Sequence, residues 1–499
     1  MLIPASLFTD GAVLCRNKEI RIFGEEDSGA EVTAVLLDRG GKVLAEAVCR
    51  SRDGRFLLSL CPQEVQTGCR LVLSSGEDRV TAEDLAIGDV YLAGGQSNME
   101  MELRNAAGGT EAVEEDSLLR FFNVPRMALV NEEQQRAVRE TRWQPVTKET
   151  AGFNSAVATY FGMAMRRKRP DIPVGIIGCY WGGTSVACWM NEETLRMTAE
   201  GIRYLDEYAK GSAGKTMETW QEEEKAFRQG MDDWNRKADE YRAGHPGADD
   251  GEIEKILGPF PWNPPAGPGS PFRPTGLAES MLKEIAPVTL TAALYYQGEE
   301  DTWRTEQYDV LMTALIGYWR RIFRAQELPF LFVQLPMWIP YNGEDTFTWA
   351  RTRLAQARVR DRVPGTGMIC LLDEGEYGNI HPLNKRPVGE RLAELAGKML
   401  YGEGEESPRM IEKSVNGPVI TVQATQELRT RDGGAPALLE AAGEDGVFMA
   451  AAGEIAGDTL RIRAEGVRRP VSARYAWTDW SDRANLCGLN GLPLEPFWV

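Results

Sequence analysis

The sequence predicts an α/β protein, in which helices cover both faces of a parallel sheet and smaller β units lie before and after it. Between residues 86 and 405, compact apolar runs alternate with helical patterns, which is typical of a buried parallel sheet. Short alternating runs separated by Gly, Asp and Ser precede and follow this part, as in antiparallel sheets. A chain of 499 residues is also too long for one ordinary core, so we expect several domains.

Residues 1–85 contain the alternating runs EIRIFG, EVTAVLLD, KVLAEAV, RFLLSL and RLVLSS. Their spacing predicts a small N-terminal domain that resembles a β-sandwich. Residues 406–499 return to similar runs, among them PVITVQA and TLRIRA. We interpret this segment as a second β unit and as a candidate to pack with the N-terminal domain.

The central part, residues 86–405, contains five apolar runs that we interpret as parallel strands. They are VYLAG (90–94), VGIIGC (174–179), TAALYYQ (291–297), FLFVQLP (330–336) and MICLLD (368–373). Polar or Gly-rich segments follow four of them: GGQSN, YWGGTS, GEED and DEGEYGNIHP. Because ligands bind beyond the carboxyl ends of such strands, these segments are expected to form a functional site.

Residues 191–285 interrupt the alternation and predict a helical insertion. Its aromatic and Met side chains share one helical face, a pattern that is more typical of a core than of a ligand contact. These residues are Trp220, Phe227, Met231, Trp234 and Tyr241. The Pro-rich segment GPFPWNPPAGPGSPFRP follows, and we expect it to be an irregular loop that overhangs the site.

The net charge of −18 argues against nucleic acid or an anionic membrane as a partner, since both require a basic surface. No apolar run approaches the ~18–20 residues of a membrane span, and no signal peptide is apparent. The eight cysteines show no C-x-x-C or zinc spacing, so we expect reduced thiols in a cytoplasmic protein; a mature secreted form with its leader trimmed is the alternative. Whether Cys61 and Cys69 pair stays open, as does the oligomeric state.

The sequence contains only two histidines, His245 and His381. His245 lies in RAGHPGADDGE, which predicts an exposed loop. Hydrolytic zinc sites draw on two or three imidazoles, so the low count disfavours such a site. Any chemistry that requires a histidine therefore points to His381.

Ser97 lies in LAGGQSNMEM (92–101), where an apolar run ends in two glycines. A serine at this position either caps the following helix or acts as a nucleophile at the edge of the sheet. Met99 stands where the G-x-S-x-G elbow has its second glycine, which disfavours an α/β-hydrolase.

Four motifs, in this order, resemble those of the sialate O-acetylesterase-like branch of the SGNH hydrolases: GDVYLAGGQSNMEM, VGIIGCYWGGTSVACW, AALYYQGEED and GNIHPLNKRPVGERLA. LFTDGAVLCR near the start and RYAWTDWSDRANLCGLNGLPLEPF at the end extend the resemblance over most of the chain. The resemblance implies a flavodoxin-like α/β/α core with flanking β domains. It also implies removal of O-acetyl groups from sugars, especially O-acetylated sialic acids, without a metal or another cofactor.

Residue by residue, the resemblance makes Ser97 the nucleophile of an acyl-enzyme mechanism and His381 its general base and later its general acid. The backbone N–H groups of Ser97 and Gly183 would donate to the oxyanion. Gln297, where many SGNH enzymes have an asparagine, would add a side-chain amide to this oxyanion hole.

The chain departs from the SGNH pattern at the third catalytic residue. Gly378 stands three residues before His381, where many SGNH enzymes have an aspartate. Either a backbone carbonyl holds His381 in a Ser–His dyad, or Asp373 or Glu376 folds back as the orienting acid. Asp373 is preferred between the two acids because it ends the run MICLLD, and the choice between dyad and triad stays open.

A sialic acid substrate is an anion, so an acidic protein needs a local cation to bind it. Arg304, which follows GEEDTW, is the candidate substrate-binding residue; an ion pair with Glu299, Glu300 or Asp301 is its alternative role. Lys385 and Arg386 begin a predicted helix, and we expect them to face solvent.

Two other functions fit the same pattern. The same groups serve in acetylxylan esterases and other carbohydrate acetylesterases. A carbohydrate-binding protein on an esterase scaffold is a non-enzymatic alternative, which the joint presence of Ser97, His381 and Gln297 disfavours.

Overall fold

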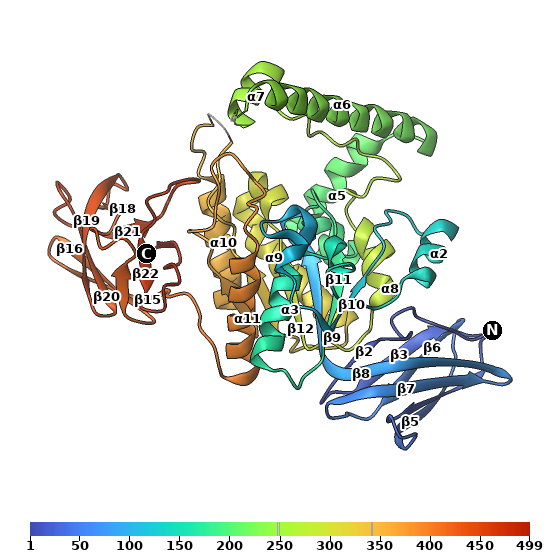
Figure 1. Cartoon of the computed structure of the whole chain (residues 1–499). Helices are drawn as coiled ribbons and strands as arrows, with labels where there is room; N and C mark the ends of the chain where they lie inside the picture. The colour runs from blue at the N-terminus through green and yellow to red at the C-terminus, as the bar shows by residue number, and fades with distance from the viewer. Residues whose placement is uncertain (247, 249, 341–342) are drawn as a thin grey trace.

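The computed structural model describes residues 1–246, 248, 250–340 and 343–499. Its centre is a parallel sheet with helices on both faces, and the N-terminal and C-terminal strands lie on opposite sides of this centre (Figure 1). The strands of the central sheet, in spatial order, are β10 (Gln144–Val146), β9 (Asp116–Asn123), β11 (Val174–Tyr180), β8 (Asp78–Gly95), β12 (Ala292–Tyr296), β13 (Phe330–Val333) and β14 (Thr366–Ile369).

The order of the five central strands determines where a ligand crevice forms. Numbered along the chain from β8 and leaving out β9 and β10, they run 2-1-3-4-5, the order of flavodoxin-like sheets. β9 extends the sheet in parallel beyond β11, and β10 pairs antiparallel with β9. The winding direction reverses between β8 and β12, so the crevice is expected beyond the carboxyl ends of these two strands.

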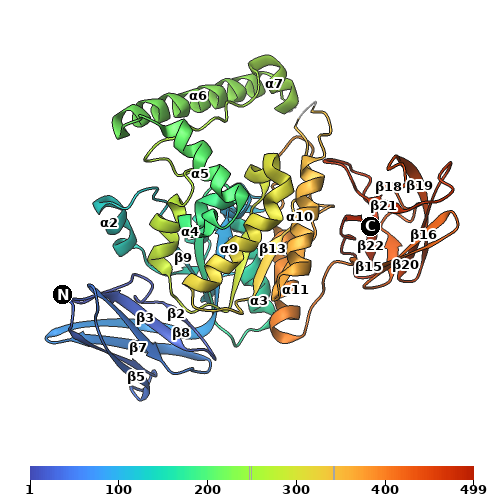
Figure 2. The same ribbon diagram turned by 180° about the vertical axis from the view of Figure 1, so that it is seen from behind.

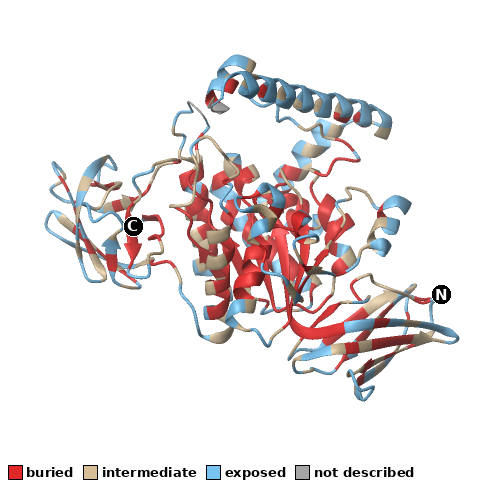
Figure 3. Ribbon diagram, in the orientation of Figure 1, coloured by how far each residue is buried: buried red, intermediate tan, exposed pale blue. Residues whose placement is uncertain are grey.

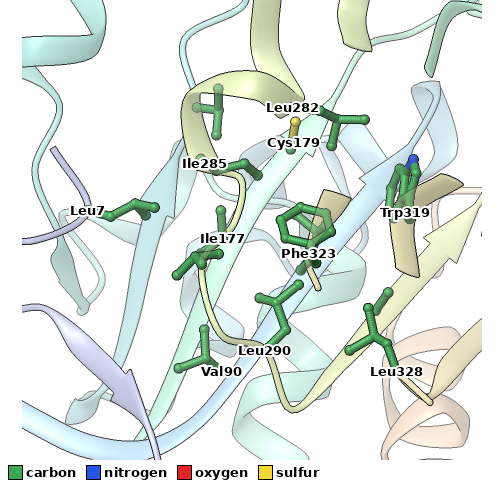
Figure 4. Close-up of a cluster of buried hydrophobic side chains, with 14 of the residues drawn as sticks. Leu7, Val90, Ile177, Cys179, Leu282, Ile285, Leu290, Trp319, Phe323 and Leu328 are labelled. Atoms are coloured by element: carbon green, nitrogen blue, oxygen red, sulfur yellow. The ribbon is translucent and has the colours of Figure 1, made fainter. Parts of the chain in front are cut away.

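Two apolar clusters cover the two faces of the sheet, as the alternation of side chains along β8 requires. Val90 and Leu92 point into one cluster, and Tyr91 and Ala93 point into the other. The first is covered by η5 (Ala278–Leu282), α8 (Lys283–Ile285), α9 (Tyr308–Ile322) and α10 (Thr348–Arg362); the second is covered by α3 (Ala156–Lys168) and α11 (Arg386–Tyr401). Figure 4 shows part of the first cluster, in which the α9 residue Trp319 packs near β8 and β11.

The N-terminal strands form antiparallel sheets that continue into the core through β8. They are β1 (Ile3–Pro4), β2 (Val13–Cys15), β3 (Ile20–Glu25), β4 (Glu31–Leu37), β5 (Val43–Arg50), β6 (Arg55–Leu60) and β7 (Gln66–Ser75). The first half of β8 pairs antiparallel with β7, and the parallel strand β2 lies beside it. One strand therefore belongs both to the N-terminal sheet and to the core.

The C-terminal segment forms a seven-stranded antiparallel sheet and a two-stranded one. Its strands are β15 (Met410–Asn416), β16 (Val419–Ala424), β17 (Leu428–Thr430), β18 (Leu439–Ala442), β19 (Phe448–Ala456), β20 (Thr459–Ala464), β21 (Ser472–Tyr475), β22 (Leu486–Gly488) and β23 (Phe497–Trp498). The expectation that this unit packs with the N-terminal strands is wrong, because the core lies between them (Figures 1 and 2). It attaches to the core instead through Asp479, whose Oδ1 accepts the N–H groups of Trp349 and Ala350 at 2.8 and 3.1 Å.

The helical insertion contains α4 (Glu192–Arg196), α5 (Ala199–Ser212), α6 (Met217–Gly244) and α7 (Asp250–Leu257). Helix α6 stands away from the core and is largely exposed (Figure 3). The remaining short helices are α1 (Ser97–Glu100), η1 (Leu103–Asn105), η2 (Gly109–Ala112), α2 (Glu132–Glu140), η3 (Ala151–Phe153), η4 (Val186–Trp189) and η6 (Glu299–Gln307). None of the helices in the described ranges combines the length and apolarity that a membrane crossing needs. All eight cysteines, Cys61 and Cys69 included, are free thiols.

Candidate active site

Ser97 lies at the start of α1, two residues after the end of β8. Gln96 takes the N-cap position, so the Ser97 hydroxyl is not used as a helix cap. Gly95 has a φ of 133°, and a Cβ there would come within 2.1 Å of the carbonyl oxygen of Tyr296. The glycine therefore lets β8 and β12 approach closely just before the chain turns and presents Ser97.

His381 reaches Ser97 from the loop between β14 and α11. Its Nε2 lies 2.8 Å from Ser97 Oγ. Burial, together with the positive charge of Lys385, lowers the pKa of His381 to about 4. The imidazole is therefore neutral at pH 7, and a neutral ring nitrogen can accept the serine proton.

The loop around His381 is held by its own side chains. Asn379 Oδ1 accepts the backbone N–H of His381 at 3.0 Å, and Glu376 accepts from Asn379 Nδ2 and from the N–H of Leu383, both at 2.7 Å. Glu376 therefore stabilises the loop, and in the described structure it makes no hydrogen bond to the imidazole ring of His381. In the described part of the chain, no hydrogen-bond partner is found for His381 Nδ1.

Asp373 lies elsewhere than the sequence suggested. Strand β14 ends at Ile369, so Asp373 is in the following turn and not at a strand end. Its two carboxylate oxygens bind Arg391 of α11, both at 2.7 Å, and Arg431 lies at 2.8 Å. Although burial would raise the pKa of Asp373, the hydrogen bonds and charge of Arg391 lower it. The carboxylate is occupied by two arginines and makes no hydrogen bond to His381 in the described structure.

The loop after β11 brings free backbone donors to Ser97. A Cβ on Gly182 would lie 3.2 Å from that of Ser97, so the two residues are in contact. Its neighbour Gly183 has a φ of 69°, which favours glycine. Among the described residues, the N–H groups of Ser97 and Gly183 have no acceptor, so both are available to a developing oxyanion.

Gln297 lies directly beneath this site, but its amide is already engaged. Its Nε2 donates to Asp301 Oδ2 at 2.5 Å, to Gln96 Oε1 at 3.1 Å and to the Thr184 carbonyl at 3.2 Å. The side chain is 1% exposed. This geometry differs from the expected oxyanion donor, because Gln297 instead joins the turn before Ser97 to the loop of Gly183.

A buried polar chain behind the site was not predicted. Asn98 Nδ2 donates to Glu299 Oε1 at 2.6 Å and to the carbonyl of Ile380 at 3.0 Å, and Lys385 Nζ donates to Asn98 Oδ1 at 2.5 Å. Lys385 is 1% exposed, so the expectation that it faces solvent is wrong. Burial lowers the pKa of Lys385 to about 8 and raises that of Glu299. Asn98 and Lys385 lie inside the motifs of Ser97 and His381, which was the available signal.

Arg304 also lies in a different environment from the one expected. Its guanidinium pairs with Glu200 and Glu207 of α5, not with the three acids that precede it in the chain. The residue is 8% exposed and lies 4.0 Å above the ring of Tyr204 and 3.9 Å above that of Trp303. Two carboxylates therefore already occupy the group that was expected to bind a substrate anion.

The chain is similar to known carbohydrate esterases over most of its length. The family model "Carbohydrate esterase, sialic acid-specific acetylesterase" matches residues 87–243 and 275–394, which include Ser97, Gly183 and His381. The sialate O-acetylesterase of Rattus norvegicus is 24% identical over 523 residues, which cover 95% of this chain and 90% of that protein. The human sialate O-acetylesterase is 22% identical, with 95% and 88% covered. A carbohydrate acetylesterase from Xanthomonas citri superposes with a TM-score of 0.76 and 26% identity, covering 100% of this chain and 99% of that one.

The fold and the matches define a carboxylic ester hydrolase of the carbohydrate esterase class. More narrowly, the chain belongs to the sialic acid-specific acetylesterase family, whose model matches more than half of it.

Proposed function

We propose that the protein removes O-acetyl groups from sugars through an acetyl-enzyme formed on Ser97. The observation that carries this proposal is the 2.8 Å contact between Ser97 Oγ and His381 Nε2, together with the N–H groups of Ser97 and Gly183, for which the described part of the chain contains no acceptor. The strand order 2-1-3-4-5 and the position of Ser97 at the carboxyl edge of β8 support an SGNH hydrolase core in residues 86–405, between β domains at 1–85 and 406–499.

In this mechanism, His381 accepts the hydroxyl proton as Ser97 Oγ attacks the acetyl carbonyl. The carbonyl oxygen becomes negatively charged and accepts the N–H groups of Ser97 and Gly183. The C–O bond to the sugar then breaks, and His381 protonates the departing sugar hydroxyl. Water, deprotonated by His381, attacks the acetyl-enzyme. The bond from the acetyl carbon to Ser97 Oγ breaks, His381 returns the proton to Oγ, and acetate is released. The hydrogen bond between Gln297 and Asp301 helps to fix the turn before Ser97 relative to the loop of Gly183. Asn98 binds the carbonyl of Ile380, the residue next to His381.

The names of the relatives support an O-acetylated sialic acid as the substrate, and the Xanthomonas citri neighbour supports a broader range of acetylated carbohydrates. Acetylxylan and similar neutral sugars are the second candidate, because Arg304 is already paired with Glu200 and Glu207.

The test is acetate release by the purified protein from O-acetylated sialic acid and from acetylated xylan, measured in parallel. Rapid mixing with an aryl acetate should give a burst of phenol equal to the enzyme concentration if the acetyl-enzyme accumulates. Mass spectrometry of the quenched protein should then find one acetyl group on the peptide that contains Ser97. Acetate release without involvement of Ser97 would overturn the mechanism.

A further inference from the structure

A loop of the insertion, residues 258–272, reaches the oxyanion loop through Trp262. A Cβ on Gly183 would come within 2.2 Å of the Trp262 ring, so the indole lies directly against that glycine. Phe227 of α6 and Phe272 hold the indole from two sides, with ring centroids 5.9 and 5.4 Å away. Trp262 nevertheless remains 41% exposed. It is a fixed aromatic side chain that is open to solvent beside the candidate site.

The aromatic stripe of α6 supports this loop. Trp220 Nε1 donates to the carbonyl of Pro265 at 3.3 Å, and its ring packs against Gly267. Trp234 packs edge-on against Phe260 at 5.3 Å. The stripe therefore acts as a core, as its spacing predicted, but it is the core of the loop rather than of the central domain. The loop lies within residues 244–274, between the two ranges that the family model matches.

Glu300 joins Trp262 to a second exposed tryptophan, Trp303. The Glu300 carboxyl group lies beside the Trp262 indole, which acts to lower the pKa of this carboxyl. Trp303 Nε1 donates to the Glu300 carbonyl at 2.6 Å, and Trp303 is 61% exposed. The N–H of Glu300 in turn donates to Gln96 Oε1 at 3.2 Å, one residue before Ser97. Burial, with a contribution from Asp301, raises the pKa of Glu300 to about 8, so at pH 7 its carboxyl is largely protonated and can donate to a hydroxyl.

The charges around this cluster disfavour an anionic ring. Arg304 holds Trp303 in place while both its ends bind carboxylates of α5. Arg126 is paired with Glu100, and Lys385 is buried against Asn98. Groups of the protein engage all three of these cations, so none of the three is left unpaired for a substrate carboxylate.

We infer that Trp262, Glu300 and Trp303 form the binding site for the sugar of the substrate and that this sugar is a neutral acetylated pyranose. The inference rests on the proposed function and specifies its substrate class. Indole faces present apolar surface to the C–H groups of a pyranose, and the Glu300 carboxyl offers hydrogen bonds to its hydroxyls. The acetyl ester would then lie over Ser97, because the cluster contacts both Gly183 and Gln96.

The experiment compares kcat and KM of the wild type, Trp262→Ala, Trp303→Ala and Glu300→Ala on three substrates. These are acetylated xylo-oligosaccharides, O-acetylated sialic acid and p-nitrophenyl acetate. Trp262→Ala should lower kcat/KM for the xylo-oligosaccharides by about tenfold or more, mainly through KM, as is usual for a contact tryptophan. Activity on p-nitrophenyl acetate should change by less than about threefold, because Asp301 holds the oxyanion loop independently through the N–H of Val186 at 2.9 Å.

Phe260→Ala is the matched control, since it removes the contact with Trp234 in the same loop but leaves the rings of Phe227 and Phe272 that pack against Trp262. It should leave all three activities nearly unchanged, whereas Trp262→Phe should restore most of the xylo-oligosaccharide activity. Equal losses on all substrates in Trp262→Ala, or a similar loss in Phe260→Ala, would mean that the loop is only structural. A wild-type preference for O-acetylated sialic acid would overturn the neutral class. Neither result would affect the proposed mechanism, which fails only if Ser97→Ala keeps its activity.

Discussion

The edge of the central sheet around Ser97 and the inserted loop around Trp262 meet at Gly183 but are built on different principles. Around Ser97, buried polar groups hold one another: Gln297 is 1% and Lys385 1% exposed, and both are hydrogen-bonded to buried side chains. Around Trp262, aromatic rings pack on a helix that is itself largely exposed (Figure 3). Hydrogen-bonded networks fix atomic positions closely, whereas aromatic contacts tolerate small displacements.

This difference suggests how the molecule divides its work. A nucleophile and its base must be held within a few tenths of an ångström, which suits buried strand ends. A sugar ring needs a firm but adaptable surface, which a separate insertion can provide. The family model matches the first region and is interrupted at the loop that carries Trp262, whereas Glu300 and Trp303 lie inside its second matched range.

The largest effect should come from the proposed catalytic pair, Ser97 and His381. Ser97→Ala and His381→Ala should each lower kcat on every acetate ester by roughly 10³-fold or more, because each removes one half of a single proton-transfer unit. For the same reason, the double variant should be little worse than either single one. Steady-state rates on p-nitrophenyl acetate and on an acetylated sugar provide the measurement. If Ser97→Ala keeps most of its activity, the comparison between a catalytic and a recognition region no longer holds.

Sequence patterns were sufficient to predict the elements that carry Ser97 and His381, the proposed catalytic pair. Each of the five apolar runs overlaps a strand of the central sheet, and the glycine pair before Ser97 includes Gly95, whose conformation and close contact with Tyr296 require glycine. His381 was singled out because the chain has only one other histidine, and the structure brings it to Ser97. These features are local in sequence, so the pattern of apolar residues and the amino-acid composition are sufficient to detect them.

The polar partners were not predictable in the same way, because they depend on contacts between distant segments. Arg304 forms an ion pair with Glu200, which lies about a hundred residues earlier in the chain, on a helix of the insertion. Lys385 precedes α11 and has the pattern of an exposed residue, but the loop before it folds inward and buries the ammonium against Asn98. The side of the core on which the C-terminal sheet packs was not predictable either. It depends on Asp479, which accepts a backbone N–H of α10 at Trp349, 130 residues earlier in the chain.

An intermediate effect should come from the buried chain behind the pair. In the wild type, activity should fall only as the pH drops through about 4, where the general base His381 becomes protonated. Lys385→Met removes the positive charge, one of the two causes of that low pKa, so the pKa of His381 should rise. The pH at which activity falls on the acid side of the profile (the acid limb) should then move upward by about one pH unit. The measurement is the pH profile of kcat/KM between pH 3.5 and 8.

Glu299 and Glu376, which face Lys385, reinforce this direction, because their negative charges would no longer be offset by the ammonium. Lys398→Met is the matched control: Lys398 lies on α11 but is partly exposed and pairs with Glu406. Its acid limb should coincide with that of the wild type. An unchanged limb in Lys385→Met would show that burial alone sets the pKa of His381.

The smallest effect on activity should come from Asp373→Asn. Asp373 lies in the turn after β14, just outside the group of residues around Ser97 and His381. An orienting carboxylate is worth ~10⁴ in kcat in a serine protease, but Asp373 binds Arg391 and Arg431 instead. We therefore expect kcat/KM on p-nitrophenyl acetate to change by less than about tenfold, while the midpoint of thermal unfolding falls by a few degrees at pH 7.

The stability loss in Asp373→Asn should depend on pH in a direction that the arginines determine. Because Arg391 lowers the pKa of Asp373 in the folded state, the carboxylate contributes stability above the unfolded pKa of about 4. That contribution is lost as the pH falls through the lower folded value, so the difference in unfolding midpoint between wild type and variant should narrow in this acidic range. Thermal unfolding followed by circular dichroism at several pH values measures it. A ~10⁴-fold loss of kcat/KM with an unchanged unfolding midpoint would instead make Asp373 the third catalytic residue. The network of buried polar groups around Ser97 would then include Asp373 and its α11 partner, Arg391.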